Sequence, residues 1–111
     1  MAYDHHQKDR IDTILSSKGI SFYSRKMMGG LCYMVDDKML CGLVKNQLMA
    51  RIGPGAYAEA LAMEHVNKMN FTGRAMTGYV FVDDEGIDMD EDLEHWIQMC
   101  LEYNAVAKIS K

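Results

Sequence analysis

The spacing of apolar residues predicts three helices. Residues 4–17 carry apolar side chains at helical spacing and are followed by a glycine, which favours a helix end. A second apolar stripe follows Pro54, a residue suited to the first position of a helix. The clearest pattern lies between Leu93 and Leu101, where apolar residues fall at i, i+3, i+4, i+7 and i+8. We expect this last helix to end near residue 107.

Between the first two helical segments the pattern is typical of β-strands joined by tight turns. Gly29-Gly30 is a turn signal, and two dipeptides, Asp36-Asp37 and Lys45-Asn46, separate apolar runs by the length of a two-residue hairpin loop. Residues 78–82 should form the last strand, whereas residues 64–77 lack a clear period and should form an ordered connection. We therefore expect one domain, residues 1–111. Its class is α+β, with two layers and an antiparallel sheet of about five strands and three helices in the order α-β-β-β-β-α-β-α.

If each of these two dipeptides is a two-residue hairpin loop, the strand register is fixed and the side chains are divided between two faces of the sheet. One face is wholly apolar and should be the core side: Cys32, Met34, Met39, Cys41, Leu43, Leu48, Ala50 and Ile52. The other face is apolar at its centre and polar at its margin: Leu31, Tyr33, Val35, Lys38, Leu40, Gly42, Val44, Gln47, Met49 and Arg51.

Two arrangements would cover the second face, because the helices of a two-layer domain cover only one side of an antiparallel sheet. A helix or residues 64–77 could lie across it, or it could be a homodimer or partner interface. We favour association, because a polar rim around an apolar centre is typical of interfaces. The candidate interface residues are Leu31, Tyr33, Val35, Leu40, Val44, Met49 and Arg51.

Composition narrows the range of partners and the compartment. The 111 residues have a net charge of −4, and the 12 basic residues are dispersed, which weighs against direct nucleic-acid binding. Eleven methionines indicate adaptable packing or a pliable contact surface. The sequence has no apolar run long enough to span a membrane and no signal peptide at its polar start. Together with three widely spaced cysteines, these features predict a cytoplasmic protein.

The sequence offers no pattern typical of a metal or cofactor site. Acidic residues are concentrated between Asp83 and Glu94, but a calcium loop counted from Asp88 has Leu93 and Met99 where it needs Gly and Glu. Helix capping and solvation explain these acids better. There is no phosphate-binding glycine pattern either. We expect no metal and no cofactor.

Catalytic residues are likewise not expected. No serine lies in a Gly-x-Ser-x-Gly elbow, and His65 and His95 read as solvated side chains. The literal register places Cys32 directly opposite Cys41, so that a reversible disulfide is conceivable. Buried thiols that act as small apolar side chains are the better interpretation.

Four stretches, residues 25–31, 49–54, 69–80 and 92–96, resemble the N-terminal domain of the TfoX/Sxy family, regulators associated with bacterial competence. The specific signals are Met-x-Gly-Gly and Phe-Thr-Gly-Arg-x-Met, in this order and spacing. Met28 stands where the family usually has Phe, and the chain ends where longer members continue into a helical C-terminal domain. The family-motif residues are Arg25, Met27, Gly29, Gly30, Gly53, Pro54, Phe71, Gly73, Arg74, Met76 and Gly78.

The resemblance implies a stand-alone two-layer α+β domain of a kind that commonly dimerises. It also implies a non-enzymatic regulatory role, as a transcriptional co-regulator that acts through protein contacts. The alternative is a small-ligand-binding protein or enzyme that uses a groove between sheet and helices. Its polar groups would be Arg25, Tyr33, Arg51 and Arg74.

Overall fold

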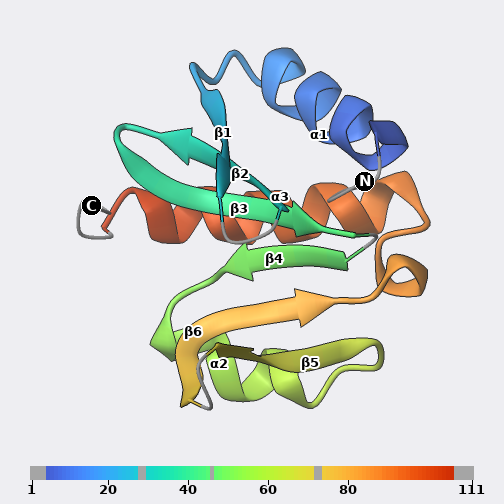
Figure 1. The fold of residues 1–111 in the computed structure, drawn as a ribbon, viewed down its shortest axis with the longest axis vertical. Helices are drawn as coiled ribbons and strands as arrows, with labels where there is room; N and C mark the ends of the chain where they lie inside the picture. Colours follow the sequence, from blue (N-terminus) through green and yellow to red (C-terminus); the bar gives the residue numbers. More distant parts are fainter. Residues whose placement is uncertain (1–4, 28–29, 46, 72–73, 107–111) are drawn as a thin grey trace.

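The computed structural model describes residues 5–27, 30–45, 47–71 and 74–106; at residues 27, 68–71 and 74–77 it describes the backbone alone. Three helices and six strands follow one another along the chain (Figure 1). They are α1 (His5–Ser17), β1 (Tyr23–Met27), β2 (Gly30–Val35), β3 (Lys38–Val44), β4 (Gln47–Arg51), α2 (Pro54–Leu61), β5 (Val66–Phe71), β6 (Arg74–Val82) and α3 (Asp90–Asn104), with a short 3-10 turn at Asp84–Gly86.

The α+β class and the order of the predicted elements are confirmed, with one addition. Residues 64–77 were expected to form a connection, but most of them belong to β5 and to the start of β6. β5 is an edge strand that carries polar residues such as Asn67, which explains why its sequence lacks the alternation of a half-buried strand.

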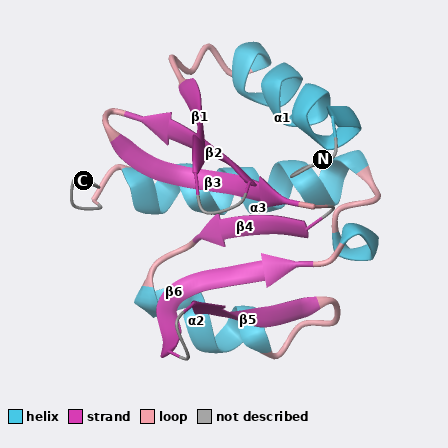
Figure 2. Cartoon of the chain, viewed as in Figure 1, coloured by secondary structure: helices cyan, strands magenta, loops and turns pink. Residues whose placement is uncertain are grey.

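All neighbouring strands are antiparallel, in the order β1-β2-β3-β4-β6-β5. The three helices lie together on one side of this sheet (Figure 2). There α3 contacts β3 and β4, α2 contacts β5 and β6, and α1 contacts α3. The sheet is strongly twisted, so that β1 runs steeply across the direction of β3 in Figure 1.

The turn at Asp36-Asp37 forms where the sequence places it, while Asn46 of the second predicted turn lies outside the described residues. Asp36 and Asp37 both have positive φ, 54° and 61°, the conformation that a two-residue type I′ turn requires. β3 and β4 pair in the predicted register, with Val44 opposite Gln47. The second hairpin is therefore predicted correctly from its turn alone.

The first hairpin departs from the predicted register at a β-bulge. Near the turn Met34 pairs with Met39 as predicted, but the next residue, Tyr33, pairs with Cys41 and leaves Leu40 as the extra residue. Beyond the bulge every partner is shifted by one residue, so Cys32 pairs with Gly42. The predicted Cys32–Cys41 pair is wrong.

The bulge also reverses the predicted faces of β2, because neighbouring residues of a strand point to opposite sides. Leu31, Tyr33, Val35 and Leu40 are at most 7% exposed and belong to the helix-covered core. Cys32, Met34 and Met39, predicted for that core, lie on the opposite side in a separate cluster. The core draws on both layers and includes Ile11, Leu15, Leu43, Leu48, Ala50, Ile52, Val80, Val82, Leu93, Trp96, Ile97 and Cys100.

Candidate interaction surface: the outer face of the sheet

The outer face is the side of the sheet turned away from the three helices. Residues directly opposite one another in a ladder point to the same side, so the pairing defines its members. From β1 to β6 they include Tyr23, Arg25, Cys32, Met34, Met39, Gly42, Val44, Gln47, Met49, Arg51, Tyr79 and Phe81.

A second hydrophobic cluster, separate from the core, occupies the centre of the outer face. Cys32, Met34, Met39 and Met49 are each at most 4% exposed, and the partly buried Tyr79 and Phe81 pack against them. In the part of the chain that the structure describes, these cluster members come from strands alone. Unlike the core, this cluster is therefore assembled without a contribution from the described helices.

Gly42 leaves the space that one of these methionines fills. A Cβ at Gly42 would lie 2.7 Å from the Cε of Met49 and the same distance from the Leu31 carbonyl oxygen. The long, unbranched thioether of Met49 therefore lies across a position that has no side chain. Such adaptable packing is characteristic of methionine.

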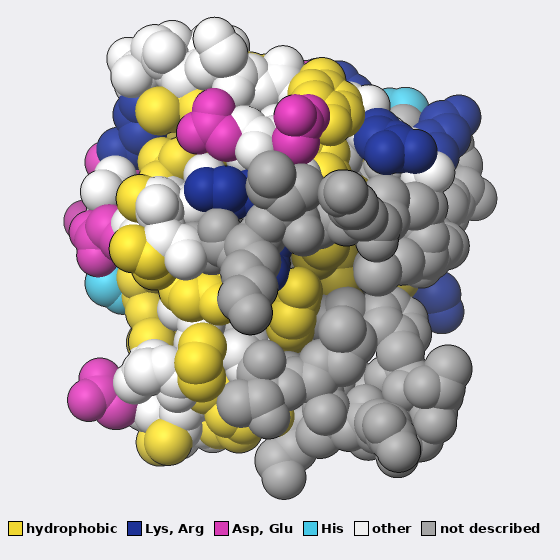
Figure 3. All heavy atoms as spheres, turned by 90° about the vertical axis from the view of Figure 1, so that its left-hand side faces the viewer, with side chains coloured by type: hydrophobic (Ala, Val, Ile, Leu, Met, Phe, Trp, Pro, Cys, Tyr) yellow, Lys and Arg dark blue, Asp and Glu magenta, His cyan; other side chains and the backbone are white. Residues whose placement is uncertain are grey.

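Arg51 joins the outer face to the last turn of α3. Its guanidinium carbon lies 5.6 Å from the ring centre of Tyr79 and 5.5 Å from that of Tyr103, which are distances of cation–π contacts. Its Nη1 also donates to the Met39 carbonyl oxygen at 3.5 Å. Figure 3 views the molecule from the side on which β2 turns into β3, where charged groups interrupt the hydrophobic surface.

Two family-motif glycines, Gly53 and Gly78, let the backbones of β4 and β6 approach closely beside Arg51. The amides of Ile52 and Gly53 both donate to the Gly78 carbonyl oxygen, at 2.9 and 3.1 Å. A Cβ on Gly78 would lie 3.2 Å from the Gly53 carbonyl carbon, and both glycines have positive φ, 86° and 92°. Pro54 then starts α2. The roles of these three residues are therefore in shaping the backbone.

Most of the other motif residues lie near the ends of the β1–β2 and β5–β6 hairpins. Gly30 begins β2 opposite Met27, and a Cβ there would overlap the Leu43 carbonyl oxygen. Phe71 and Arg74 pair at the end of the β5–β6 hairpin, and Met76 follows in β6. Gly29 and Gly73 lie outside the described residues. Arg25 is exposed on the outer face.

The predicted interface set is therefore divided between two sides of the sheet. The β-bulge turns four of the predicted residues toward the helices, where they are buried and cannot form a surface: Leu31, Tyr33, Val35 and Leu40. Val44, Met49 and Arg51 do lie on the outer face, with Val44 partly buried at the end of β3. Tyr79 and Phe81 were missed, although their alternation with Val80 and Val82 within residues 78–82 was a readable signal.

The polar groups proposed for a ligand groove do not converge. Tyr33 faces the helices, where its hydroxyl lies 2.8 Å from Asp12 Oδ1 and 3.2 Å from the Lys8 carbonyl oxygen. Arg25 and Arg51 lie on the opposite side of the sheet. The Arg74 side chain lies outside the described part of the chain.

All three cysteines are free and buried. Burial raises the pKa of Cys32, raises that of Cys41 well above its usual value and raises that of Cys100 to about 12. Because the thiolate is the reactive form, these groups are poor nucleophiles at neutral pH. They act as small apolar side chains.

Residues 5–27, 30–45, 47–71 and 74–106 contain neither a cluster of metal ligands nor a membrane-spanning helix. No three His, Cys, Asp or Glu side chains there are grouped so that they could hold a metal ion. No helix in these ranges combines the length and apolar character needed to cross a membrane.

Comparison with known proteins identifies one family. The model described as the TfoX N-terminal domain matches residues 17–103, which extend from the last residue of α1 almost to the end of α3. No curated protein and no solved structure matches the chain. The match confirms the resemblance found in the motif residues.

Proposed function

The chain belongs to the TfoX N-terminal domain family, and from this premise we propose that it is a non-enzymatic regulatory domain that acts through protein contacts. The proposal includes a cytoplasmic location and a role as a transcriptional co-regulator in bacterial competence. A protein partner, and not nucleic acid, would be its direct target, because its net charge of −4 opposes binding to phosphates.

The outer face is the observation that carries this proposal. Its centre, a cluster of methionines and one cysteine, is at most 4% exposed and cannot itself reach a partner, whereas its margin holds tyrosines and arginines, of which Tyr23 and Arg25 are exposed. Tyrosine and arginine are enriched among residues that dominate binding energy. Tyr23, on the edge strand β1, is 45% exposed.

We propose that two copies of the chain associate through the exposed part of this face, along β1. A two-fold axis would bring the same patch of each copy together, which is the commonest arrangement of homodimers. The exposed edge strand β1 would lie in the contact, where Arg25 could reach a carboxylate of the other copy.

Adjacent residues of β1 provide a matched test. Arg25 lies on the outer face and Lys26 on the other, yet both are exposed cations on the same strand. We expect light scattering to find a dimer at micromolar concentration. Arg25→Glu should weaken association at least tenfold, since it reverses a charge at the interface, whereas Lys26→Glu should leave it unchanged. A strict monomer, or equal effects of both variants, would contradict dimerisation.

The regulatory role has its own experiment with the same pair. The wild type and the Lys26→Glu variant, used as baits in the native cell, should retain a protein partner that the Arg25→Glu variant loses. Transcription of competence genes should then fall with Arg25→Glu alone. If Arg25→Glu changes neither the retention of the partner nor the transcription of competence genes, the proposed role of the outer face is wrong.

A further inference from the structure

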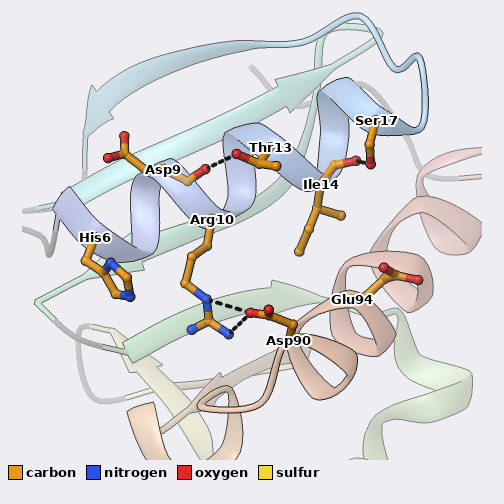
Figure 4. Close-up of a pocket in the computed structure, with 8 residues that line it drawn as sticks. All are labelled: His6, Asp9, Arg10, Thr13, Ile14, Ser17, Asp90 and Glu94. Carbon is orange, nitrogen blue, oxygen red and sulfur yellow. Dashed lines mark hydrogen bonds and ion pairs between the residues drawn. The ribbon is translucent and has the colours of Figure 1, made fainter.

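A groove between α1 and the first turns of α3 lies apart from the outer face. Its volume is about 400 Å³, within the roughly 300–1,000 Å³ typical of ligand sites. In Figure 4, Arg10 and Ile14 point from α1 toward α3, which contributes Asp90 and Glu94. The groove is lined by His6, Asp9, Arg10, Thr13, Ile14, Ser17, Asp90 and Glu94.

Arg10, in the wall of this groove, donates four hydrogen bonds to other protein groups. Its Nε and Nη2 donate to Asp90 Oδ1 at 3.3 and 3.0 Å, and Nη2 also donates to the Asp88 carbonyl oxygen at 3.2 Å. Its Nη1 donates to Gln7 Oε1 at 2.6 Å, and the side chain is 13% exposed. Arg10 therefore joins α1 to α3, and each of its three nitrogens already donates to a protein group.

The groove keeps a surplus of negative charge. Among the described residues, the carboxylates of Asp9 and Glu94 form no ion pair. Asp90 forms one, with Arg10. Lys8 of α1 pairs with Asp12, and Lys18, which follows α1, donates to the neutral amide of Gln98 and does not line the groove. The lining therefore holds three carboxylates against one guanidinium and the imidazole of His6, so the groove is complementary to a cation.

The dimensions of the groove favour a peptide over a small cation. Its α1 wall runs from His6 to Ser17, which at 1.5 Å per residue is roughly 16 Å. An extended chain of about five residues has this length. The partly buried Ile14 offers an apolar surface between the carboxylates, where the aliphatic stem of a lysine or arginine could lie.

We propose that this groove binds an extended, basic segment of a partner protein. A lysine or arginine of the segment places its charged end at Glu94 and its stem against Ile14, and a second cation reaches Asp9. The site is built from α1 and α3 and shares no residue with the outer face. A negative result for this site would therefore not contradict the proposed dimer, and the reverse also holds.

The test uses the full chain and a fluorescent hexapeptide of alternating arginine and alanine, followed by anisotropy. We expect saturable binding that weakens with added salt, and no binding of the matching peptide with glutamate in place of arginine. The double variant Asp9→Asn/Glu94→Gln should weaken binding about three- to tenfold, because it removes two ion pairs. The control double variant Glu59→Gln/Asp84→Asn removes two exposed carboxylates outside the groove and should bind as the wild type does.

Several outcomes would overturn the proposal. These are the absence of saturable binding to the wild type, equal binding of the two peptides, or equal losses in the two double variants. Full displacement of the peptide by equimolar spermidine would identify a free polyamine site and not a docking site for a protein. The substituted carboxylates are exposed, so the fold should be kept, and the peptide comparisons on the wild type decide the question in any case.

Discussion

Gly53→Ala tests the close packing where β4 leads into α2. Gly53 has φ 86° and ψ 160°, a region that only glycine occupies readily, so a side chain there costs about 1–3 kcal/mol. The new Cβ would also lie 2.6 Å from Tyr103 Cε1. Such overpacking adds about 1–3 kcal/mol. The total, about 2–6 kcal/mol, is a large part of the roughly 5–15 kcal/mol by which domains are stable.

A double-mutant cycle separates these two contributions. In a Tyr103→Ala background the steric part should disappear, so that Gly53→Ala then costs only about 1–3 kcal/mol. Urea denaturation followed by circular dichroism measures all four proteins. Gly55→Ala is the control, because no atom lies within 4 Å of its new Cβ, and it should change stability by at most about 1 kcal/mol. Losses that simply add, or a Gly53→Ala loss below about 1 kcal/mol, would refute the reasoning.

Three more predictions concern polar and titratable groups in the interior. Tyr33→Phe removes the hydroxyl that lies 2.8 Å from Asp12 Oδ1, and should lower the free energy of unfolding by about 1 kcal/mol in urea titrations. Burial raises the pKa of Cys100 from 9.0 to about 12, so above pH 9 the unfolded chain loses a proton that the folded chain keeps. Stability should then fall by about 1.4 kcal/mol per pH unit from this thiol, and less steeply in Cys100→Ala, as urea titrations between pH 8 and 11 would show. Arg10→Ala removes four hydrogen bonds between α1, Asp90 and their neighbours, and should accelerate amide exchange throughout α1.

The helices and the second hairpin could be predicted because local signals determine them. Pro54 marks the start of α2, and the stripe from Leu93 to Leu101 identifies α3. The first hairpin could not be predicted fully, because no residue type announces an extra residue at Leu40. Whether a bulge forms depends on how β3 packs beneath the helices, which is a tertiary effect.

The extra residue, Leu40, also explains why only some residues of the outer face were predicted. Once the register shifts, Tyr33 turns to the core and Met34 to the outer face. The face assigned to β4 was correct, because its register with β3 has no bulge, and Met49 and Arg51 were therefore placed correctly. An error in register affects a whole strand at once, whereas an error at a helix end affects a turn.

The position of α1 shows that a recognisable signature and a stable folding unit need not have the same limits. The family match begins at residue 17, yet Ile11 and Leu15 of α1 are fully buried in the core that the matched strands and α3 form. A protein trimmed to the matched residues would therefore open that core to water at Tyr33. The physical boundary of this domain lies at least one helix before the point where its family becomes visible in the sequence.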